Sequence, residues 1–196
     1  NTASANTAVG HNAGYNNTSG ANNTAIGYAA LVSNTTASNN TAVGYQAGYS
    51  NTTGYNNIAT GYQSLYNNTT GYENNATGVV ALLSNTTGAF NTAYGNASVR
   101  SNTTGNYNTG IGVNALYSNT TASYNTAVGY QAAYSTTTGA GLTYIGYQAG
   151  YSTTTGIDNS AVGYGALKAN TTGTSQVAMG LNALNSNSTG NYNIAI

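Results

Sequence analysis

The pentapeptide Asn6-Thr7-Ala8-Val9-Gly10 begins the pattern that decides the fold. It returns as Asn-Thr-Ala-Ile-Gly at residues 23–27 and as Asn-Thr-Ala-Val-Gly at residues 40–44. Degenerate copies follow every 17 residues, and no interval contains an insertion or a deletion. These copies begin at residues 57, 74, 91, 108, 125, 142, 159, 176 and 193. Such a strict period predicts a solenoid in which each copy forms one coil, because one additional residue would shift every contact between coils.

With Asn6 as position 1, the 17-residue consensus is N-T-A-V-G-Y-Q-A-G-Y-S-N-T-T-G-Y-N. Position 5 is glycine in all eleven copies that reach it, and position 4 is valine or isoleucine in eight of twelve. Position 8 is always alanine or serine, and position 15 is glycine in nine copies and alanine in two. In a solenoid, the residues at one repeat position form a column that runs from coil to coil.

Repeat length and composition favour β-structure over helix. Helical repeats need about 33 residues or more, and Asn, Thr, Ser and Gly are poor helix formers. We predict one strand at positions 1–5, a second around positions 8–13, and corners at the glycines of positions 5 and 15, which reach positive φ without strain. Residues 1–196 are therefore expected to form a single all-β repeat array, a parallel β-solenoid or β-roll of about 11.5 coils. At about 4.8 Å per coil, the rod would be roughly 55 Å long.

The predicted interior is thin. Leu, Ile, Val and Phe together account for 27 of the 196 residues, which is low for a compact domain. We expect the interior to hold position 4, position 8 and the leucines of position 9. Stability should then come mainly from backbone ladders and from stacked side chains, including amide ladders of the asparagines at positions 1 and 12. The position 9 leucines are Leu31, Leu65, Leu82, Leu116, Leu167 and Leu184.

Charge is almost absent. The chain carries two cations, Arg100 and Lys168, and two acids, Glu73 and Asp158, with a formal net charge of zero. The cations both fall at position 10 and the acids both at position 17, so these positions should face solvent. Nucleic-acid binding needs a basic face and is excluded as a class. Disorder usually combines low hydrophobicity with high net charge, which this chain lacks.

Nothing in the sequence indicates an enzyme. His11 is the single histidine and stands where tyrosine is usual, as expected for a surface substitution. Glu73 and Asp158 are five coils apart, about 24 Å at 4.8 Å per coil, whereas paired catalytic carboxylates lie within about 10 Å. The chain has no cysteine and therefore no thiolate metal site. We predict no catalytic activity, no cofactor and no metal.

Two columns are candidate sites. Tyrosines at position 10 form a candidate surface ladder, in which ring stacking and hydroxyl hydrogen bonds would suit sugars. The triplet Asn-Thr-Thr at positions 12–14 forms possible glycosylation sites. The alternative is a structural ladder and turn, favoured because Thr-Thr-Thr replaces the triplet at residues 136–138 and 153–155 in unchanged register. The tyrosines are Tyr15, Tyr49, Tyr66, Tyr117, Tyr134 and Tyr151, and the asparagines are Asn34, Asn51, Asn68, Asn85, Asn102, Asn119 and Asn170.

The stretch Asn39–Ala47, N-N-T-A-V-G-Y-Q-A, resembles the head repeat of trimeric autotransporter adhesins, which contains a run close to S-V-A-I-G-x-x-A. It is also similar to repeats of phage tail-fibre-like proteins. The resemblance implies a left-handed parallel β-roll, three chains around one axis, and an extracellular stalk that binds host or matrix surfaces. Alanine at position 3 would then permit close approach between chains. The family repeat is shorter, and its valine at position 2 is mostly threonine here.

We therefore expect a segment of a longer extracellular fibre protein, located on a cell surface or virion. It would form a homotrimer or a filament and bind glycans or a host or matrix surface, with no nucleic-acid partner and no membrane span in this segment. The alternative is an ice-binding β-solenoid. Positions 13 and 14 give adjacent threonine columns, of which only one can face outward. Ice-binding surfaces usually show Thr-x-Thr, which positions 12 and 14 match only at residues 136–138 and 153–155.

Overall fold

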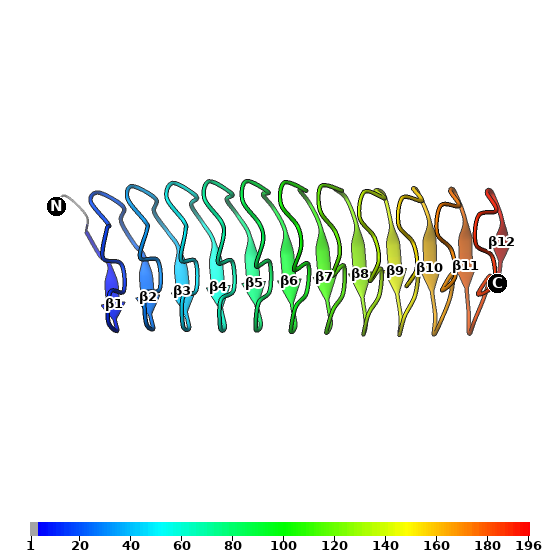
Figure 1. The fold of residues 1–196 in the computed structure, drawn as a ribbon, viewed down its shortest axis with the longest axis horizontal. Coiled ribbons are helices and arrows are strands. Elements are labelled where there is room, and N and C mark those ends of the chain that lie inside the picture. Colours follow the sequence, from blue (N-terminus) through cyan, green and yellow to red (C-terminus); the bar gives the residue numbers. More distant parts are fainter. Residues whose placement is uncertain (1–3) are drawn as a thin grey trace.

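The computed structural model describes residues 4–196, which form a row of stacked coils with the two ends of the chain at opposite ends (Figure 1). Each coil contributes one short strand, and the strands make one parallel sheet in chain order from β1 to β12. The strands are β1 (Thr7–Val9), β2 (Thr24–Ile26), β3 (Thr41–Val43), β4 (Ile58–Thr60), β5 (Asn75–Thr77), β6 (Thr92–Tyr94), β7 (Thr109–Ile111), β8 (Thr126–Val128), β9 (Thr143–Ile145), β10 (Ser160–Val162), β11 (Val177–Met179) and β12 (Ile194–Ala195). Over the described range there is no helix, and so none that could cross a membrane.

The register between strands equals the sequence repeat. Ala8 pairs with Ala25 in the first strand pair, and nine coils further along the chain Ala161 pairs with Ala178 in the same way. Every strand therefore aligns each of its residues with the residue 17 places later. The predicted parallel β-solenoid of 17-residue coils is confirmed, and its strand occupies positions 2–4, inside the predicted span of positions 1–5.

The second predicted strand, around positions 8–13, is wrong. These positions form turns and bends, although they still hydrogen-bond between coils, as from the Leu65 amide to the Ala81 carbonyl at 2.9 Å. The reason lies in the backbone angles of positions 7 and 9. Gln63 has a φ of 50° and Leu65 a φ of 53°, both left-handed, so the chain curls instead of extending.

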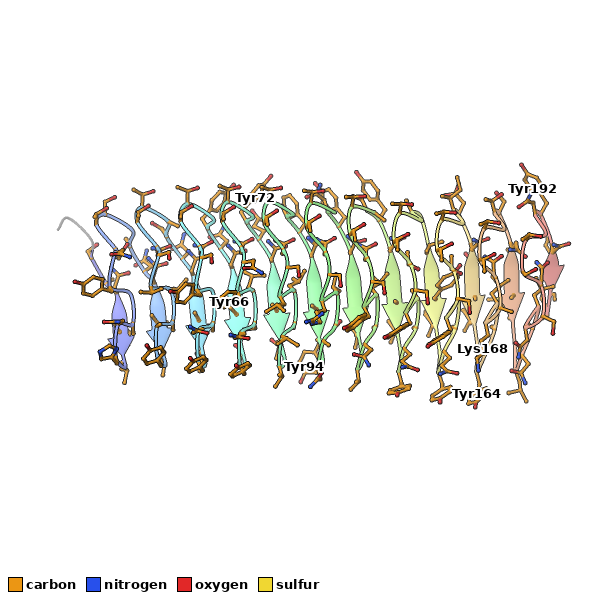
Figure 2. All side chains as sticks on the ribbon, viewed as in Figure 1. Tyr66, Tyr72, Tyr94, Tyr164, Lys168 and Tyr192 are labelled. Atoms are coloured by element: carbon orange, nitrogen blue, oxygen red, sulfur yellow. The ribbon has the colours of Figure 1, made fainter. Side chains whose placement is uncertain are left out.

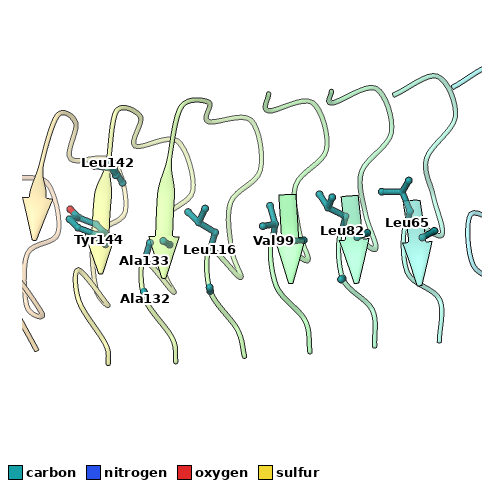
Figure 3. Close-up of a cluster of buried hydrophobic side chains, with 14 of the residues drawn as sticks. Leu65, Leu82, Val99, Leu116, Ala132, Ala133, Leu142 and Tyr144 are labelled. Atoms are coloured by element: carbon teal, nitrogen blue, oxygen red, sulfur yellow. The ribbon is translucent and has the colours of Figure 1, made fainter. Parts of the chain in front are cut away.

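The interior holds smaller side chains than predicted. Position 3 alanines such as Ala42 point inward and are buried. Position 8 and the leucines of position 9 are buried with them, except near the ends of the rod, where Leu184 is partly buried (Figure 3 shows Leu65, Leu82 and Leu116). Placing position 4 in the interior was wrong, since Ile26 is 38% exposed and Val9 is 57% exposed. Neighbouring strand residues face opposite sides, and except in β9, where Tyr144 points inward, the coil takes the smaller residue inward. The position 3 alanines therefore cannot mediate close approach between chains.

The two glycine columns have different physical causes. Gly44 at position 5 has a φ of 139°, and a Cβ there would overlap the carbonyl oxygen of Gly61 in the next coil. The predicted corner at position 5 is confirmed. At position 15 the glycines do not have positive φ, contrary to the prediction. A Cβ on Gly54 would instead overlap the carbonyl oxygen of Gly71, so close packing between coils favours glycine there.

Candidate functional site

The position 12 asparagines form an amide ladder inside the coils. Asn51 Nδ2 donates to Asn34 Oδ1 at 3.0 Å and to the Gly54 carbonyl of its own coil at 2.8 Å. The same pair of bonds recurs one coil later, where Asn68 donates to Asn51 and to Gly71. The predicted ladder at position 12 is confirmed.

The position 1 asparagines form a second internal ladder that meets the first. Asn40 Nδ2 donates to the Gly54 carbonyl at 2.9 Å, so this oxygen accepts from Asn40 and from Asn51. Asn40 Oδ1 accepts the backbone N–H of Asn57, one coil away, at 2.9 Å. In this part of the rod the two ladders satisfy the buried amides, and both donate to the carbonyl at position 15.

The seven asparagines of the possible glycosylation sites all lie inside the coil. None has more than 1% of its surface exposed, and each side-chain nitrogen donates to the position 15 carbonyl of its own coil. The folded chain therefore presents none of these nitrogens to solvent. They are Asn34, Asn51, Asn68, Asn85, Asn102, Asn119 and Asn170.

The position 12 ladder is interrupted where threonine replaces asparagine. Asn119 Oδ1 and Thr136 Oγ1 are buried without a hydrogen-bond partner. In the coil after that of Thr136, the ring of Tyr144 stands at position 3, where alanine is usual, and its hydroxyl lies 3.0 Å from Thr153 Oγ1. The ring occupies the space next to Gly150, so closely that a Cβ on that glycine would overlap it (Figure 3 shows Tyr144).

Burial raises the pKa of Tyr144 from 10.0 to about 12, partly offset by the hydrogen bond to Thr153. Sequence reasoning did not single out this cluster. Its signal was present, because three coincident departures from the consensus fall within one coil. They are leucine at position 1, tyrosine at position 3 and threonine at position 12, which are Leu142, Tyr144 and Thr153.

The position 10 tyrosines lie on the outside of the rod. Tyr15 is 73% exposed and the other five are half-buried. Stacking joins neighbouring rings, with centroids 5.0 Å apart for Tyr49 and Tyr66 (Tyr66 is labelled in Figure 2). The Arg100 guanidinium extends the column by donating to the Tyr117 hydroxyl at 3.2 Å. Because stacked rings cover one another's faces, a ligand meets mainly the ring edges and hydroxyls of this column.

Aromatic columns also run along the rod on both sides of the sheet, next to the two ends of the strands. Position 6 carries stacked tyrosines at one edge, including Tyr147 and Tyr164 with centroids 4.8 Å apart. Positions 16 and 17 carry a second aromatic column, in which Tyr72 meets Phe90 edge to face and Phe90 stacks on Tyr107. Figure 2 shows Tyr164 at the lower edge of the rod and Tyr72 at the upper edge.

The two threonine columns differ in exposure, as predicted. Position 13 is half-buried, and its hydroxyls donate to the next coil, as Thr69 does to the Thr86 carbonyl at 3.0 Å. Position 14 is exposed in every coil, as at Thr70, and its hydroxyls donate no hydrogen bond within residues 4–196. Position 12 is buried, so Thr136 is not displayed beside Thr138, and residues 136–138 do not present a Thr-x-Thr surface.

The ionisable side chains do not gather into a site. His11 is exposed and stacks on Tyr28 with ring centroids 5.5 Å apart. The described part of the chain contains no cluster of three or more His, Cys, Asp or Glu side chains that could hold a metal ion. Comparison with family models, curated proteins and solved structures gave no match for this chain. The candidate site is therefore the set of exposed columns, each of which repeats one side chain per coil.

Proposed function

We propose that the chain is a segment of an extracellular structural and adhesive fibre on a cell surface or virion. The observation that supports this most is the unbroken 17-residue register of β1 to β12, which arranges exposed and half-buried tyrosines in columns on the outside of a rod. The fibre would act as a homotrimer or filament and would attach to glycans or to a host or matrix surface.

Repetition supplies the binding mechanism. Each coil offers a weak contact through tyrosine hydroxyls and ring edges, and a rigid rod holds many such contacts at one spacing. Once one coil is bound, the next binds at a high effective concentration, so avidity exceeds the affinity of a single coil by orders of magnitude. With two cations and two acids in 196 residues, this attachment depends little on salt.

The test is binding of the purified 196-residue chain to arrayed polysaccharides and to surfaces coated with matrix proteins. We expect slow dissociation from at least one surface, and faster dissociation when Tyr49, Tyr66, Tyr117 and Tyr134 are replaced by serine. Serine at the exposed Thr53, Thr70, Thr121 and Thr138 provides a matched control in the same coils. Absence of binding to every surface, together with absence of filaments in electron micrographs, would contradict the proposal.

A second candidate function is ice binding, which the exposed position 14 column favours. Its eleven serine or threonine hydroxyls, from Ser19 to Thr189, recur once per coil. Such a column could order water at a fixed spacing. An ice-recrystallisation assay tests this function, with lysine at Thr70, Thr87 and Thr104 expected to abolish any inhibition. Absence of inhibition by the unmodified chain would exclude it.

A further inference from the structure

The outer face of the sheet carries a mostly apolar column, at position 4, beside a column that is mostly threonine, at position 2. We define the outer sheet face as the outward side chains of positions 2 and 4 on β1 to β12. Position 4 carries a valine, isoleucine, methionine or tyrosine in ten of twelve coils. In β4 the residue types of the two positions are exchanged. Ile58 stands at position 2 and is 42% exposed, and Thr60 stands at position 4. The exposed members include Val9, Ile26, Ile58, Tyr94, Ile111, Ile145 and Met179.

This distribution reverses the usual one, because alanine fills the interior while the branched side chains face outward. Ala127 is fully buried in β8, whereas its neighbour Val128 is only half-buried. Contiguous exposed apolar patches of several hundred Å² on a soluble protein mark interaction sites. The outer sheet face carries no charged side chain, since all four charges of the chain stand at positions 10 and 17.

The size of the face matches an interface between proteins. Twelve strands at about 4.8 Å give a length of about 53 Å, and positions 2–6 at about 3.3 Å per residue give a width of about 13 Å. The product, roughly 700 Å², is close to the ~800 Å² that each partner contributes to a stable interface. The tyrosines of position 6 border this area along one edge, as aromatic residues do in many interfaces.

The regular spacing of the apolar side chains along the rod favours one kind of partner. Its apolar side chains recur once per coil, about every 4.8 Å, on strands that lie in a nearly straight row (Figure 1). A globular partner has no matching period, whereas a second copy of this chain has the same period, the same neutral surface and the same ridges. Two sheets can pack face to face at about 10 Å with their side chains interdigitated.

From this we infer that the outer sheet face binds a second copy of this chain along the length of the rod. The inference rests on the proposed fibre role for its homo-oligomer and adds the face that joins the chains. It also replaces the expected contact through position 3, which the fold places in the interior.

Sedimentation of the full chain tests this inference. We expect the unmodified chain to sediment at two or three times its 19.7 kDa mass. The double variant Ile111→Glu with Val128→Glu should sediment as one chain, because charge would be buried at the interface. The control is Thr121→Glu with Thr138→Glu, on the exposed position 14 of the same two coils, which should keep the mass of the unmodified chain.

A cross-linking experiment keeps the inference testable if the double variant fails to fold. The chain has no cysteine, so Thr109→Cys places one thiol at position 2 of β7. A short bis-maleimide should link Thr109→Cys chains and leave Thr121→Cys chains unlinked. A single-chain mass for the unmodified protein, or equal linking of both cysteine variants, would overturn the inference. If the chain binds a surface but sediments as a single chain, the adhesive role stands and this inference fails. If the chains associate with one another but bind no surface, only the adhesive role is contradicted.

Discussion

Asn68 Nδ2 lies 2.8 Å from Asn51 Oδ1, one coil away, and the pair is buried in the rod. Each such amide donates along the rod and also within its own coil, here to the Gly71 carbonyl at 2.8 Å. The ladder thus joins neighbouring coils and closes each coil on itself. In a chain whose interior is mostly alanine, these bonds replace much of the specificity that large apolar side chains usually supply.

Replacing Asn68 by alanine should destabilise the rod. The change leaves Asn51 Oδ1 without its donor and removes the acceptor of Asn85 Nδ2. An orphaned buried polar group costs about 1–3 kcal/mol, so the free energy of unfolding should fall by at least this amount. Urea denaturation measures it. Alanine at the adjacent, half-buried Asn67 is the control and should change the value by less than about 0.5 kcal/mol.

Placing asparagine at residue 136, which is repeat position 12, should stabilise the rod. Thr136→Asn supplies an amide donor to the orphaned Asn119 Oδ1, for an expected gain of about 1–3 kcal/mol. The same change at Thr153 should instead lower stability, because Thr153 Oγ1 lies 3.0 Å from the Tyr144 hydroxyl and leaves no room for a longer side chain. Equal effects of the two substitutions on the unfolding midpoint would contradict this account of the ladder.

Alanine should be poorly tolerated at position 5 and better tolerated at position 9. Gly44→Ala forces a φ of 139° on a residue with a Cβ and overlaps the next coil, so we expect a loss above about 3 kcal/mol. Gly48 has a φ of 60°, which Leu65 and Ala133 also adopt at this position with φ values near 50°. Gly48→Ala should cost about 1–2 kcal/mol, the ordinary penalty of a left-handed residue, and so less than Gly44→Ala. Comparable losses in thermal unfolding of the two variants would refute this distinction.

Stability should fall at alkaline pH because of Tyr144. Its pKa is about 12 in the folded chain, above the ordinary 10.0, so the unfolded chain releases this proton first. The contribution of protonated Tyr144 to the free energy of unfolding is complete below pH 10. It is lost as the pH rises through 12, at up to about 1.4 kcal/mol per pH unit. The measurement is urea denaturation between pH 9 and 12 for the unmodified chain and for Tyr144→Phe. The variant should show the shallower decline with pH, and parallel curves would be inconsistent with the assignment.

The periodicity predicted the coil length, the stacking, the glycine corner at position 5 and the asparagine ladders, because each depends only on which residues recur. It did not predict which side of the strand faces inward. Alternation requires positions 3 and 4 to oppose each other, but the choice depends on the space inside the coil. Hydrophobicity favoured Val43 for the interior, whereas the strand turns Ala42 inward and leaves Val43 half-buried on the outside.

The missing second strand has a similar cause. Positions 8–13 contain residues that extend readily, and the repeat pattern does not reveal backbone angles. Leu65 and Val99 adopt left-handed φ values of 53° and 49°, which aliphatic residues rarely do. Contacts between coils enforce this conformation, as in the hydrogen bond from the Val99 amide to the Ala115 carbonyl at 2.9 Å. A tertiary constraint of this kind cannot be derived from the residue types alone.

The constant register also has a genetic consequence. Because each strand residue pairs with the residue 17 places later, deletion or duplication of one repeat rejoins equivalent partners. Recombination between repeats can therefore change the length of the rod in steps of about 4.8 Å while its cross-section stays the same. The coil of Tyr144 is the exception, since its ring depends on Gly150 and on Thr153. A crossover that separates these three residues would leave a clash or a void, so rods of altered length should keep them together.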